Sequence, residues 1–453
     1  MPVTKTPLLA QTVRKLVGRG AAANAYNILS KLHPSEIAEL LGELQENYRK
    51  PAFELLVQRN SRLASEALSE FGVDRGAELL LDMSAEEISR LLQELDPDDA
   101  AEFVGHLPTP LQEEILGAMR HKDAAEVQDL LQYPEQTAGR IMNPKVFSLH
   151  EDMTVGEAIT RLQSSDEVEM VFYIYVVDDR NHLVGVLSLR QLLLKRPDRR
   201  LKDIMVTKVF SARTDTDQED VARLVDSYNV LAIPVVDEEN KLVGVITVDD
   251  VIDVIKEEAT EDIYRLAGLD VHERVFSSPG TSVRMRIPWL AVNLATAFLA
   301  AFVVSLFEGT IQRFAVLAVF MPIVAGMGGN AGTQTLTVMV RGIALGELSW
   351  SNSRKALVKE TLVGIVNGLT IGFFVAVVAF LWKGSAVLGG ILALAMIGNL
   401  LVAAVMGTLV PLALRWLKVD PALASSVFVT TATDVCGFML FLGLGAHFLG
   451  HLV

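Results

Sequence analysis

The sequence predicts a multi-domain membrane protein, with an all-α N-terminal superhelical domain, a repeated α/β unit, a long connecting helix and a transmembrane domain of five helices. Three observations support this fold class. Residues 1–280 carry 30 Lys plus Arg against 50 Asp plus Glu, whereas residues 281–453 carry 10 against 5. The acidic part contains a repeat at an offset of 59 residues, and the remainder contains five long apolar segments. The chain therefore divides into an acidic part outside the bilayer and a membrane domain at 285–453.

Residues 1–132 are expected to form a helical N domain. Helix start signals recur there, such as Ser84 followed three residues later by Glu87, and Asp96 followed directly by Pro97. A hydroxyl or carboxylate at the N-cap, with an acid at N3 or a proline at N1, is typical of a helix start. Because short helices follow one another quickly, we expect a superhelical stack of helical hairpins.

A tandem repeat follows the helical region. Residues 175–188 match residues 234–247, and the pair Ile141-Met142 recurs as Ile204-Met205. Each unit has the pattern of a helix, an apolar strand, an acidic turn, a second strand and another helix. On these residues the region resembles a pair of CBS domains, which are regulatory modules that often bind adenine nucleotides.

This resemblance implies a first CBS unit at 137–200 and a second at 201–255. In the second unit, Thr247 and Asp250 follow a glycine in the order Gly-x-x-Thr-x-x-Asp, which looks like the family's ribose-binding motif. The first unit has other residues at those places, Ser188 and Gln191. The resemblance therefore implies at most one good site for ATP or another adenine nucleotide. The alternative is a dimerisation module without a ligand.

An acidic connecting helix, or plug, is expected at 248–280. Four acids recur on one face at positions i, i+3, i+7 and i+11, namely Asp250, Asp253, Glu257 and Glu261. Two more lie alongside, Glu258 and Asp262. Like charges four residues apart destabilise a helix, so a divalent cation bound among the acids explains them better. The alternative is an ordinary solvated charged face.

Five segments are long and apolar enough to cross a bilayer: 287–307, 314–340, 361–382, 386–414 and 423–448. Lys and Arg gather before the first span, between the second and third, and between the fourth and fifth. The positive-inside rule therefore puts the N-terminus in the cytoplasm and the C-terminus outside a cell membrane, the inner one where there are two. No apolar signal segment opens the chain, so the acidic part is expected in the cytosol.

A single carboxylic acid, Asp434, stands in the last apolar span. An acid at bilayer depth costs about 2.5–3.5 kcal/mol and usually serves an ion path, a proton relay or a buried partner. The second span contains a glycine-rich run ending in polar residues, with Asn330, Thr333 and Gln334, and later spans add Asn367 and Asn399. Such glycines either permit close helix packing or free backbone carbonyls beside a water-filled cavity.

These residues resemble the MgtE family of magnesium channels and transporters. The matching positions are Pro322, Gly326, Gly328, Gly329, Asn330, Gly332 and Gln334, with Thr433, Asp434 and Gly437. The order of parts agrees over essentially the whole chain. The resemblance implies a homodimer with one Mg²⁺ pore at the interface, opened when cytosolic Mg²⁺ falls. It implies pore ligands at Asp434, Asn330, Gly328 and Thr433.

The same resemblance implies a Mg²⁺ sensor made of acidic residues in the N domain, the second CBS unit and the connecting helix. The matching positions are Asp98, Glu102, Asp217, Asp226, Asp249, Asp250, Asp253, Glu258, Glu261 and Asp262. Asn229 stands where a further acid is expected.

The physical chemistry of Mg²⁺ also suits the pore that the resemblance implies. A twofold axis would turn Asp434 into two carboxylates that face one hydrated ion.

Composition and motifs exclude several other classes. So acidic a module repels the phosphates of nucleic acid, which argues against nucleic acid as a partner. The one cysteine, Cys436, excludes an intramolecular disulfide and cysteine-based zinc sites. An intramembrane aspartyl protease needs two aspartates, and no enzyme motif is present, so the chain is not expected to be an enzyme. A proton-coupled divalent cation transporter, with Asp434 as proton carrier, is the alternative function. The sequence leaves open the choice among Mg²⁺, Mn²⁺, Co²⁺ and Ca²⁺.

Overall fold

The computed structural model describes residues 6–164, 172–273, 275, 277–423 and 425–449. The predicted N domain, first CBS unit, connecting helix and fifth span each include some residues outside these ranges: 1–5, 165–171, 274, 276 and 424. The last residues of the membrane domain, 450–453, also lie outside them. The chain forms two compact units, residues 1–256 and 257–453. Each unit is described by itself.

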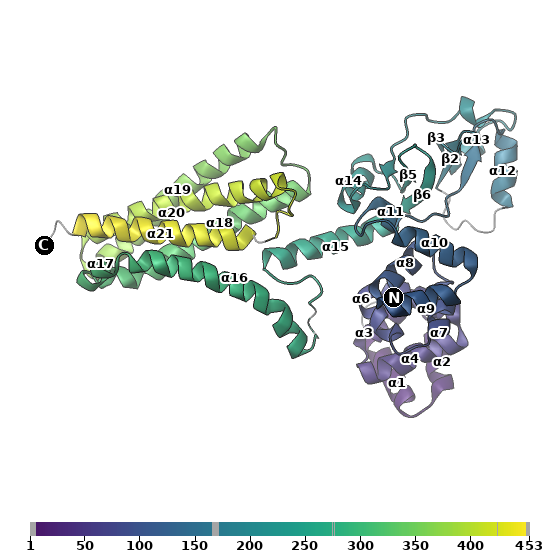
Figure 1. The fold of residues 1–453 in the computed structure, drawn as a ribbon, viewed down its shortest axis with the longest axis horizontal. Helices are drawn as coiled ribbons and strands as arrows, with labels where there is room; N and C mark the ends of the chain where they lie inside the picture. The colour runs from purple at the N-terminus through teal and green to yellow at the C-terminus, as the bar shows by residue number, and fades with distance from the viewer. Residues whose placement is uncertain (1–5, 165–171, 274, 276, 424, 450–453) are drawn as a thin grey trace. The chain divides into compact units, whose positions relative to one another are not determined.

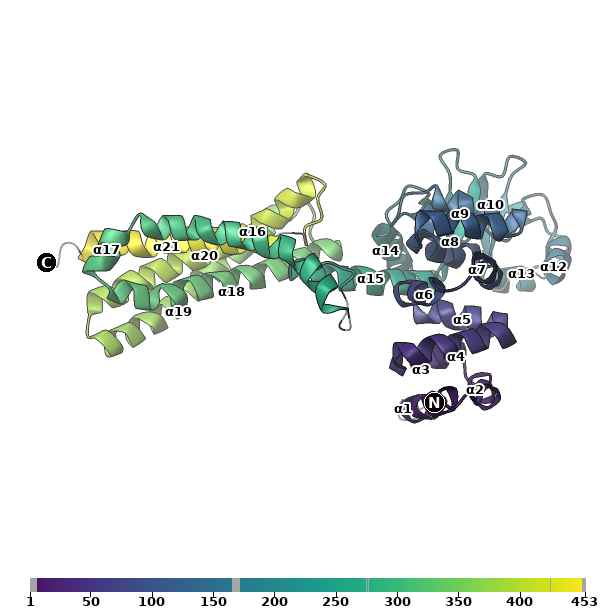
Figure 2. The same cartoon turned by 60° about the horizontal axis from the view of Figure 1, so that its bottom comes forward.

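Ten helices form the N-terminal part of the first unit. They are α1 (Thr6–Gly18), α2 (Ala22–Leu29), α3 (Pro34–Glu43), α4 (Glu46–Arg59), α5 (Ser61–Phe71), α6 (Val73–Leu80), α7 (Ala85–Leu92), α8 (Pro97–His106), α9 (Thr109–Ala118) and α10 (His121–Leu131). Figure 2 shows them stacked in successive layers, which confirms the predicted superhelical arrangement. The capping box at Ser84 and Glu87 forms as expected, since each side chain accepts from the other residue's backbone N–H. Three fully buried rings, Phe53, Phe71 and Phe103, lie in the core.

The repeat folds as two matching α/β units. The first contains α11 (Ala138–Ile141), β1 (Ser148–His150), α12 (Val155–Gln163), β2 (Tyr173–Val177), β3 (Leu183–Ser188) and α13 (Leu189–Leu194). After the 3-10 turn η1 (Leu201–Asp203), the second contains β4 (Ala212–Arg213), α14 (Gln218–Tyr228), β5 (Ala232–Val236) and β6 (Leu242–Thr247). Each sheet has three strands in sequence order, with a parallel pair followed by an antiparallel pair.

The two hairpin turns join the units symmetrically. Asn181 and Asn240 both adopt positive φ, at 65° and 64°, a conformation that asparagine tolerates better than most residues. The Asn181 side chain donates to the carbonyl of Leu242 at 2.9 Å, and the Asn240 side chain donates to that of Leu183 at 3.3 Å. This reciprocal pair of hydrogen bonds is the structural counterpart of the sequence repeat.

Helix α15 (Val248–Leu266) follows β6, and the division between the two compact units falls within it. It ends earlier than the connecting helix predicted at 248–280. The next helix, α16 (Pro279–Ser305), begins before the expected first span because Ser278 caps it and Pro279 occupies its first turn. A short helix that the sequence did not predict, α17 (Glu308–Arg313), comes after it.

Four further long helices complete the second unit: α18 (Val316–Ala344), α19 (Ser353–Lys383), α20 (Ala386–Trp416) and α21 (Ser425–Leu449). With α16 they make five helices in the described part of the chain that are long and apolar enough to cross a membrane, which confirms the predicted five-helix domain. In both views α16 runs along α21 (Figures 1 and 2). Glycines bring α19 close to α20, since a Cβ on Gly364 or Gly372 would meet a backbone oxygen of α20 at 2.9 Å.

Candidate functional site

The membrane residues predicted to bind an ion lie on two packed helices, α18 and α21. Asp434 is half-buried on α21, and Asn330 is exposed on α18 within the single chain. Thr433 is fully buried and donates its hydroxyl to the carbonyl of Thr430 at 2.9 Å. A Cβ built on Gly332 would meet the side chains of Val429 and Thr433, so small residues bring α18 close to α21 at this level. Within the single chain Asn330 is therefore exposed and Asp434 half-buried, whereas Thr433 is buried where α18 and α21 pack together.

Gly328 lies in a different environment from Asn330. It is buried against the side chain of Asn399 on α20, and Gly437 on α21 lies against the same side chain. Asn399 is fully buried and donates its amide to the carbonyl of Val324 at 2.9 Å. Its Oδ1 has no hydrogen-bond partner within the described part of the chain. Asn399 therefore fixes the junction of α18, α20 and α21, and the ion-binding role of Gly328 remains a prediction.

In the first unit, two pairs of aspartates come together from distant parts of the sequence. Asp98 and Asp99 lie in the first turn of α8, and Asp249 and Asp250 lie in the first turn of α15. Burial, reinforced by the negative charges of Asp250 and Asp99, raises the pKa of Asp98 well above its usual range. Burial likewise raises the pKa of Asp99 to about 6 and that of Asp250 to about 6. We call Asp98, Asp99, Asp249 and Asp250 the acidic cluster.

The acidic cluster is only partly compensated by hydrogen bonds. Ser69 donates to Asp99 at 3.1 Å, and the hydroxyl of Thr247 donates to Asp250 at 2.6 Å. The Oδ1 atom of Asp98 is buried and has no hydrogen-bond partner among the residues that the structure describes. A buried acceptor without a donor costs about 1–3 kcal/mol. The cluster is therefore a place where a bound cation would relieve both repulsion and desolvation.

The chemistry of the cluster fits a hydrated divalent cation better than a closed metal cage. Among the described residues, no group of three or more His, Cys, Asp or Glu side chains is arranged around one point. Mg²⁺ often uses only one or two carboxylates and keeps several of its waters. Aspartate pairs therefore suit Mg²⁺, whereas a dehydrated ion would require more protein ligands.

The other predicted sensor acids of the first unit are dispersed. The charge of Glu102 acts on Arg140, Asp217 accepts from the backbone N–H of Glu219 at 2.8 Å, and Asp253 pairs with Lys256 at 2.7 Å. Asp226 lies in α14, whose C-cap is Asn229 with a left-handed φ of 51°. Asparagine favours that conformation, which gives a structural reason for its presence where an acid was expected.

At its end, within the second unit, α15 carries a group of ion pairs that the sequence did not predict. The Arg265 guanidinium pairs with both Glu261 and Asp420, which precedes α21 in the chain. Leu266 packs on Leu336, Val340 and Ala422. Of the remaining predicted acids, Glu258 and Asp262 lie on the same helix as Glu261. The only sequence signal for Asp420 is that it is one of five acids after residue 280.

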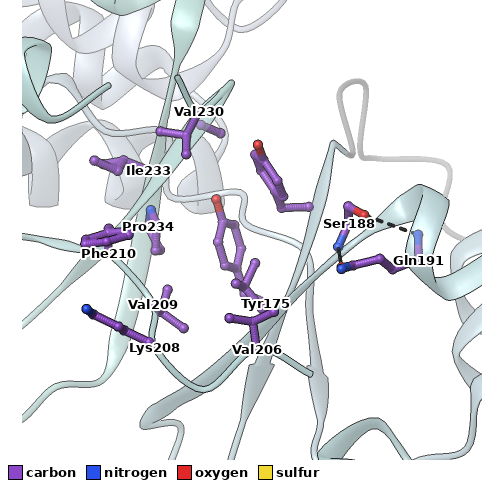
Figure 3. Close-up of a pocket in the computed structure, with 13 residues that line it drawn as sticks. Tyr175, Ser188, Gln191, Val206, Lys208, Val209, Phe210, Val230, Ile233 and Pro234 are labelled. Atoms are coloured by element: carbon purple, nitrogen blue, oxygen red, sulfur yellow. Dashed lines mark hydrogen bonds between the residues drawn. The ribbon is translucent and has the colours of Figure 1, made fainter. Parts of the chain in front are cut away.

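A cavity of about 320 Å³ lies between the two α/β units. Its lining combines aromatic, hydroxyl, amide and cationic side chains: Tyr173, Tyr175, Ser188, Gln191, Lys208, Phe210 and Pro234. Figure 3 labels all of these except Tyr173. The Tyr175 hydroxyl is buried without a hydrogen-bond partner in the described chain, and burial raises its pKa. Ser188 and Gln191 are hydrogen-bonded to one another at 3.0 and 3.2 Å (Figure 3).

The predicted ribose-binding residues do not line this cavity. The hydroxyl and the backbone N–H of Thr247 both donate to the Asp250 carboxylate, at 2.6 and 3.0 Å. Asp250 also belongs to the acidic cluster. The sequence thus indicated the motif of the second unit, whereas this cavity is lined by the equivalent residues of the first unit, Ser188 and Gln191.

Family models match most of the chain. A divalent cation transporter model, MgtE, matches residues 321–444, and a model of the MgtE intracellular N domain matches residues 32–136. A CBS domain model matches residues 138–198 and 201–257. The combination follows the order of parts found in the structure.

Relatives of similar length support the same comparison. The chain is 35% identical over 451 residues to the magnesium transporter MgtE of Thermus thermophilus, covering 96% of this chain and 97% of the relative. It is 33% identical over 439 residues to the magnesium transporter MgtE of Bacillus subtilis, covering 96% of both. The crystal structure of the cytosolic domain of the Mg²⁺ channel MgtE in complex with ATP is 36% identical, with a TM-score of 0.50, over 54% of this chain and 99% of that one.

Proposed function

Because this chain belongs to the MgtE family of magnesium transporters, we propose that it is a Mg²⁺-selective channel for magnesium uptake that cytosolic Mg²⁺ closes. The observation that carries the regulatory part is the acidic cluster, where Asp98 is buried beside Asp250 with an oxygen that has no hydrogen-bond partner among the described residues. Transport places the protein in a cell membrane as a multi-pass protein, and the positive-inside rule supports a cytosolic N-terminus and an external C-terminus.

The proposed pore lies on the twofold axis of a homodimer. Asp434 and Asn330 lie on helices that pack together, and Asn330 is exposed in the single chain. Polar groups at membrane depth face either protein or water, so a second copy is the natural cover for this face. Two copies of Asp434 would then supply the one or two carboxylates that a hydrated Mg²⁺ uses, with Thr433, the Asn330 side chain and the Gly328 carbonyl nearby.

The proposed sensor works through the same preference for oxygen ligands. Without a divalent cation, the aspartates of the acidic cluster repel one another across α8 and α15. A bound Mg²⁺ would favour the ionised forms and draw the two helices together. Helix α15 begins in the acidic cluster and continues to Leu266. A shift of this helix when Mg²⁺ binds would therefore close the pore. The same role is proposed for the other predicted acids: Glu102, Asp217, Asp226, Asp253, Glu258, Glu261 and Asp262.

Nucleotide binding is proposed as a modulator of this regulation. A related cytosolic domain has been solved with ATP, and the cavity between the α/β units of this chain has suitable chemistry. Tyr175, Phe210 and Pro234 would contact an adenine base, and Ser188 with Gln191 offers hydrogen bonds to ribose. Lys208 would then contact phosphate. In this arrangement Asp250 contributes to the acidic cluster and accepts a hydrogen bond from Thr247. Neither residue then binds the ribose.

Magnesium flux into proteoliposomes tests the proposal. The wild type should carry Mg²⁺ at clamped pH, and Asp434→Asn should abolish most of that flux, whereas Glu308→Gln, a loss of one acid from the short helix α17, should not. Asp98→Asn combined with Asp250→Asn should keep the flux at Mg²⁺ concentrations that close the wild type. Wild-type flux that requires a proton gradient would instead favour the proton-coupled transporter, with Asp434 as carrier. Competition by Mn²⁺, Co²⁺ and Ca²⁺ measures selectivity.

A further inference from the structure

A basic surface lies at one end of the membrane domain, where α18 and α20 end and α19 begins. Leu348, in the loop between α18 and α19, packs with Ile343 of α18 and Leu412 of α20, and Ala356 of α19 packs against the same cluster. The Arg415 guanidinium donates to the Leu348 carbonyl at 2.8 Å, which ties α20 to the loop. Exposed cations and tryptophans lie on these helix ends and beside them, and we call the following residues the basic rim: Arg341, Trp350, Arg354, Lys355, Arg415, Trp416 and Lys418.

The positive charge of the basic rim is not balanced within the membrane domain. Its cations form no ion pair among the residues that the structure describes. The segments that carry the rim, 341–360 and 411–420, contain three acids: Glu347, Glu360 and Asp420. Glu360 already pairs with Lys359, which is not part of the rim, and Asp420 pairs with Arg265. The first turn of α19 contains no acid, so the helix dipole adds to the positive charge there.

The lengths of α19 and α20 place the basic rim at the level of the lipid headgroups. Each helix has 31 residues, which corresponds to about 46 Å at ~1.5 Å per residue. A bilayer is about 30 Å thick in its hydrocarbon core and about 40–45 Å thick with its headgroup regions. When the apolar middle of each helix fills the core, its ends therefore lie among the headgroups. Trp350 and Trp416 are 60% and 69% exposed at these ends, and tryptophan is enriched at membrane interfaces.

The face of α19 that carries Lys355 points away from the rest of the unit. Gly364 and Gly372 lie against the backbone of α20, so the opposite face of α19 has no neighbour there. That face carries apolar side chains at helical spacing, each more than half exposed: Leu362, Val366, Leu369 and Phe373. Lys355 continues this row, seven residues before Leu362. In both views α19 lies at the edge of the second unit opposite α16 (Figures 1 and 2).

We propose that the basic rim binds the headgroups of anionic phospholipids, with its cations at the lipid phosphates and its tryptophans beside the glycerol region. Clusters of Lys and Arg next to a membrane helix attract anionic lipid, and the rim has the complementary charge. A second copy does not suit this surface, because a twofold contact through it would bring the same cations together. The inference goes beyond the proposed Mg²⁺ transport, since the rim does not include Asn330 or Asp434.

Tryptophan fluorescence of the full-length protein in bilayers tests the proposal. Trp416 remains as the one tryptophan when the other three are replaced: Trp289→Phe, Trp350→Phe and Trp382→Phe. The bilayers contain phosphatidylcholine and phosphatidylglycerol in equal amounts, and either lipid carries bromine near the top of its acyl chains, where it quenches a neighbouring tryptophan. Brominated phosphatidylglycerol should quench Trp416 at least about twofold more strongly than brominated phosphatidylcholine. In the matched control Trp382 is kept instead, and the two lipids should quench it equally, because Lys383 is the one cation beside it and stacks on its ring.

The second arm assigns the lipid preference to the charges of the rim. Adding Arg354→Gln, Lys355→Gln and Lys418→Gln should make the two lipids quench Trp416 equally, whereas adding Lys383→Gln should leave the preference unchanged. About 1 M NaCl should weaken the preference without any change to the rim cations. A preference that survives the three substitutions, or equal quenching with the rim cations intact, would overturn the proposal. Trp416 that neither lipid quenches would also overturn it, because the acidic cytosolic part or another copy would then cover the rim.

Discussion

Arg265, near the end of α15, forms an ion pair with Asp420, which lies 155 residues further along the chain and precedes α21. The same guanidinium pairs with Glu261. Arg265 thereby places a fixed positive charge between two acids, one of which was predicted to sense Mg²⁺. The last turn of α15 is therefore joined to the segment before α21 by an ion pair within the second unit.

The first prediction concerns this ion pair. Arg265→Ala should change the Mg²⁺ concentration that closes the channel by about tenfold or more, since partly buried charge-assisted pairs contribute about 1.5–3 kcal/mol and about 1.4 kcal/mol equals a factor of ten. The measurement is Mg²⁺ flux against internal Mg²⁺ concentration for Arg265→Ala, Asp420→Ala and the double variant. If the effects of the two single variants simply add, the pair has no role in closing.

The second prediction concerns the pH dependence of stability without Mg²⁺. Because the folded-state pKa values of Asp99 and Asp250 are raised to about 6, the folded state binds more protons than the unfolded state between pH 4 and 6. The contribution of these groups to stability is therefore fully present below pH 4 and is lost as the pH rises through about 6. In EDTA, the full-length protein should melt at a higher temperature at pH 5 than at pH 7.5.

The matched variant separates this effect from other titrations. Asp98→Asn with Asp250→Asn should reduce the difference in melting temperature between the two pH values, because the repulsion in the acidic cluster disappears. Millimolar Mg²⁺ should also reduce the difference in the wild type, by stabilising the ionised cluster at pH 7.5. A wild-type melting temperature that rises from pH 5 to 7.5 in EDTA would contradict the prediction.

Local signals in the sequence predicted much of the fold, but few of the contacts between distant residues. The cap at Ser84, the alternating strands and the five apolar spans depend on neighbours in sequence, so composition and spacing indicated them. The electrostatic interaction between Asp99 and Asp250 depends on tertiary packing, and so does the ion pair of Arg265 with Asp420. No signal in the sequence indicated Glu360 either, because its burial and its hydrogen bond from Thr335 on α18 also depend on tertiary packing.

The third prediction separates two places for an adenine nucleotide. Phe210→Ala should weaken ATP binding to the full-length protein about tenfold or more, because an aromatic face in the cavity would be lost. Thr247→Ala should leave ATP affinity within about twofold, since Thr247 is bonded to Asp250 and lies outside the cavity. Titration calorimetry measures both. If Thr247→Ala weakens ATP binding more than Phe210→Ala does, the nucleotide binds at the motif of the second unit, Thr247 and Asp250.

The last prediction concerns the junction that Asn399 makes with α18 and α21. A Cβ on Gly437 would lie 2.7 Å from the Asn399 amide nitrogen, which is closer than real Cβ atoms approach. Gly437→Ala should therefore destabilise the membrane domain by about 1–3 kcal/mol, as overpacking commonly does. Asn399→Ala should also destabilise it, because the hydrogen bond to Val324 is lost.

The double variant distinguishes a packing contact from two unrelated defects. Removing the Asn399 amide removes the atoms that a Cβ at Gly437 would meet, so Gly437→Ala should cost less in the Asn399→Ala background than in the wild type. Thermal unfolding of the four proteins in detergent measures this coupling. Mg²⁺ flux should follow the same order, because the junction sets how α18 and α21 present Asn330 and Asp434. Strictly additive losses would show that Asn399 and Gly437 do not form one structural unit.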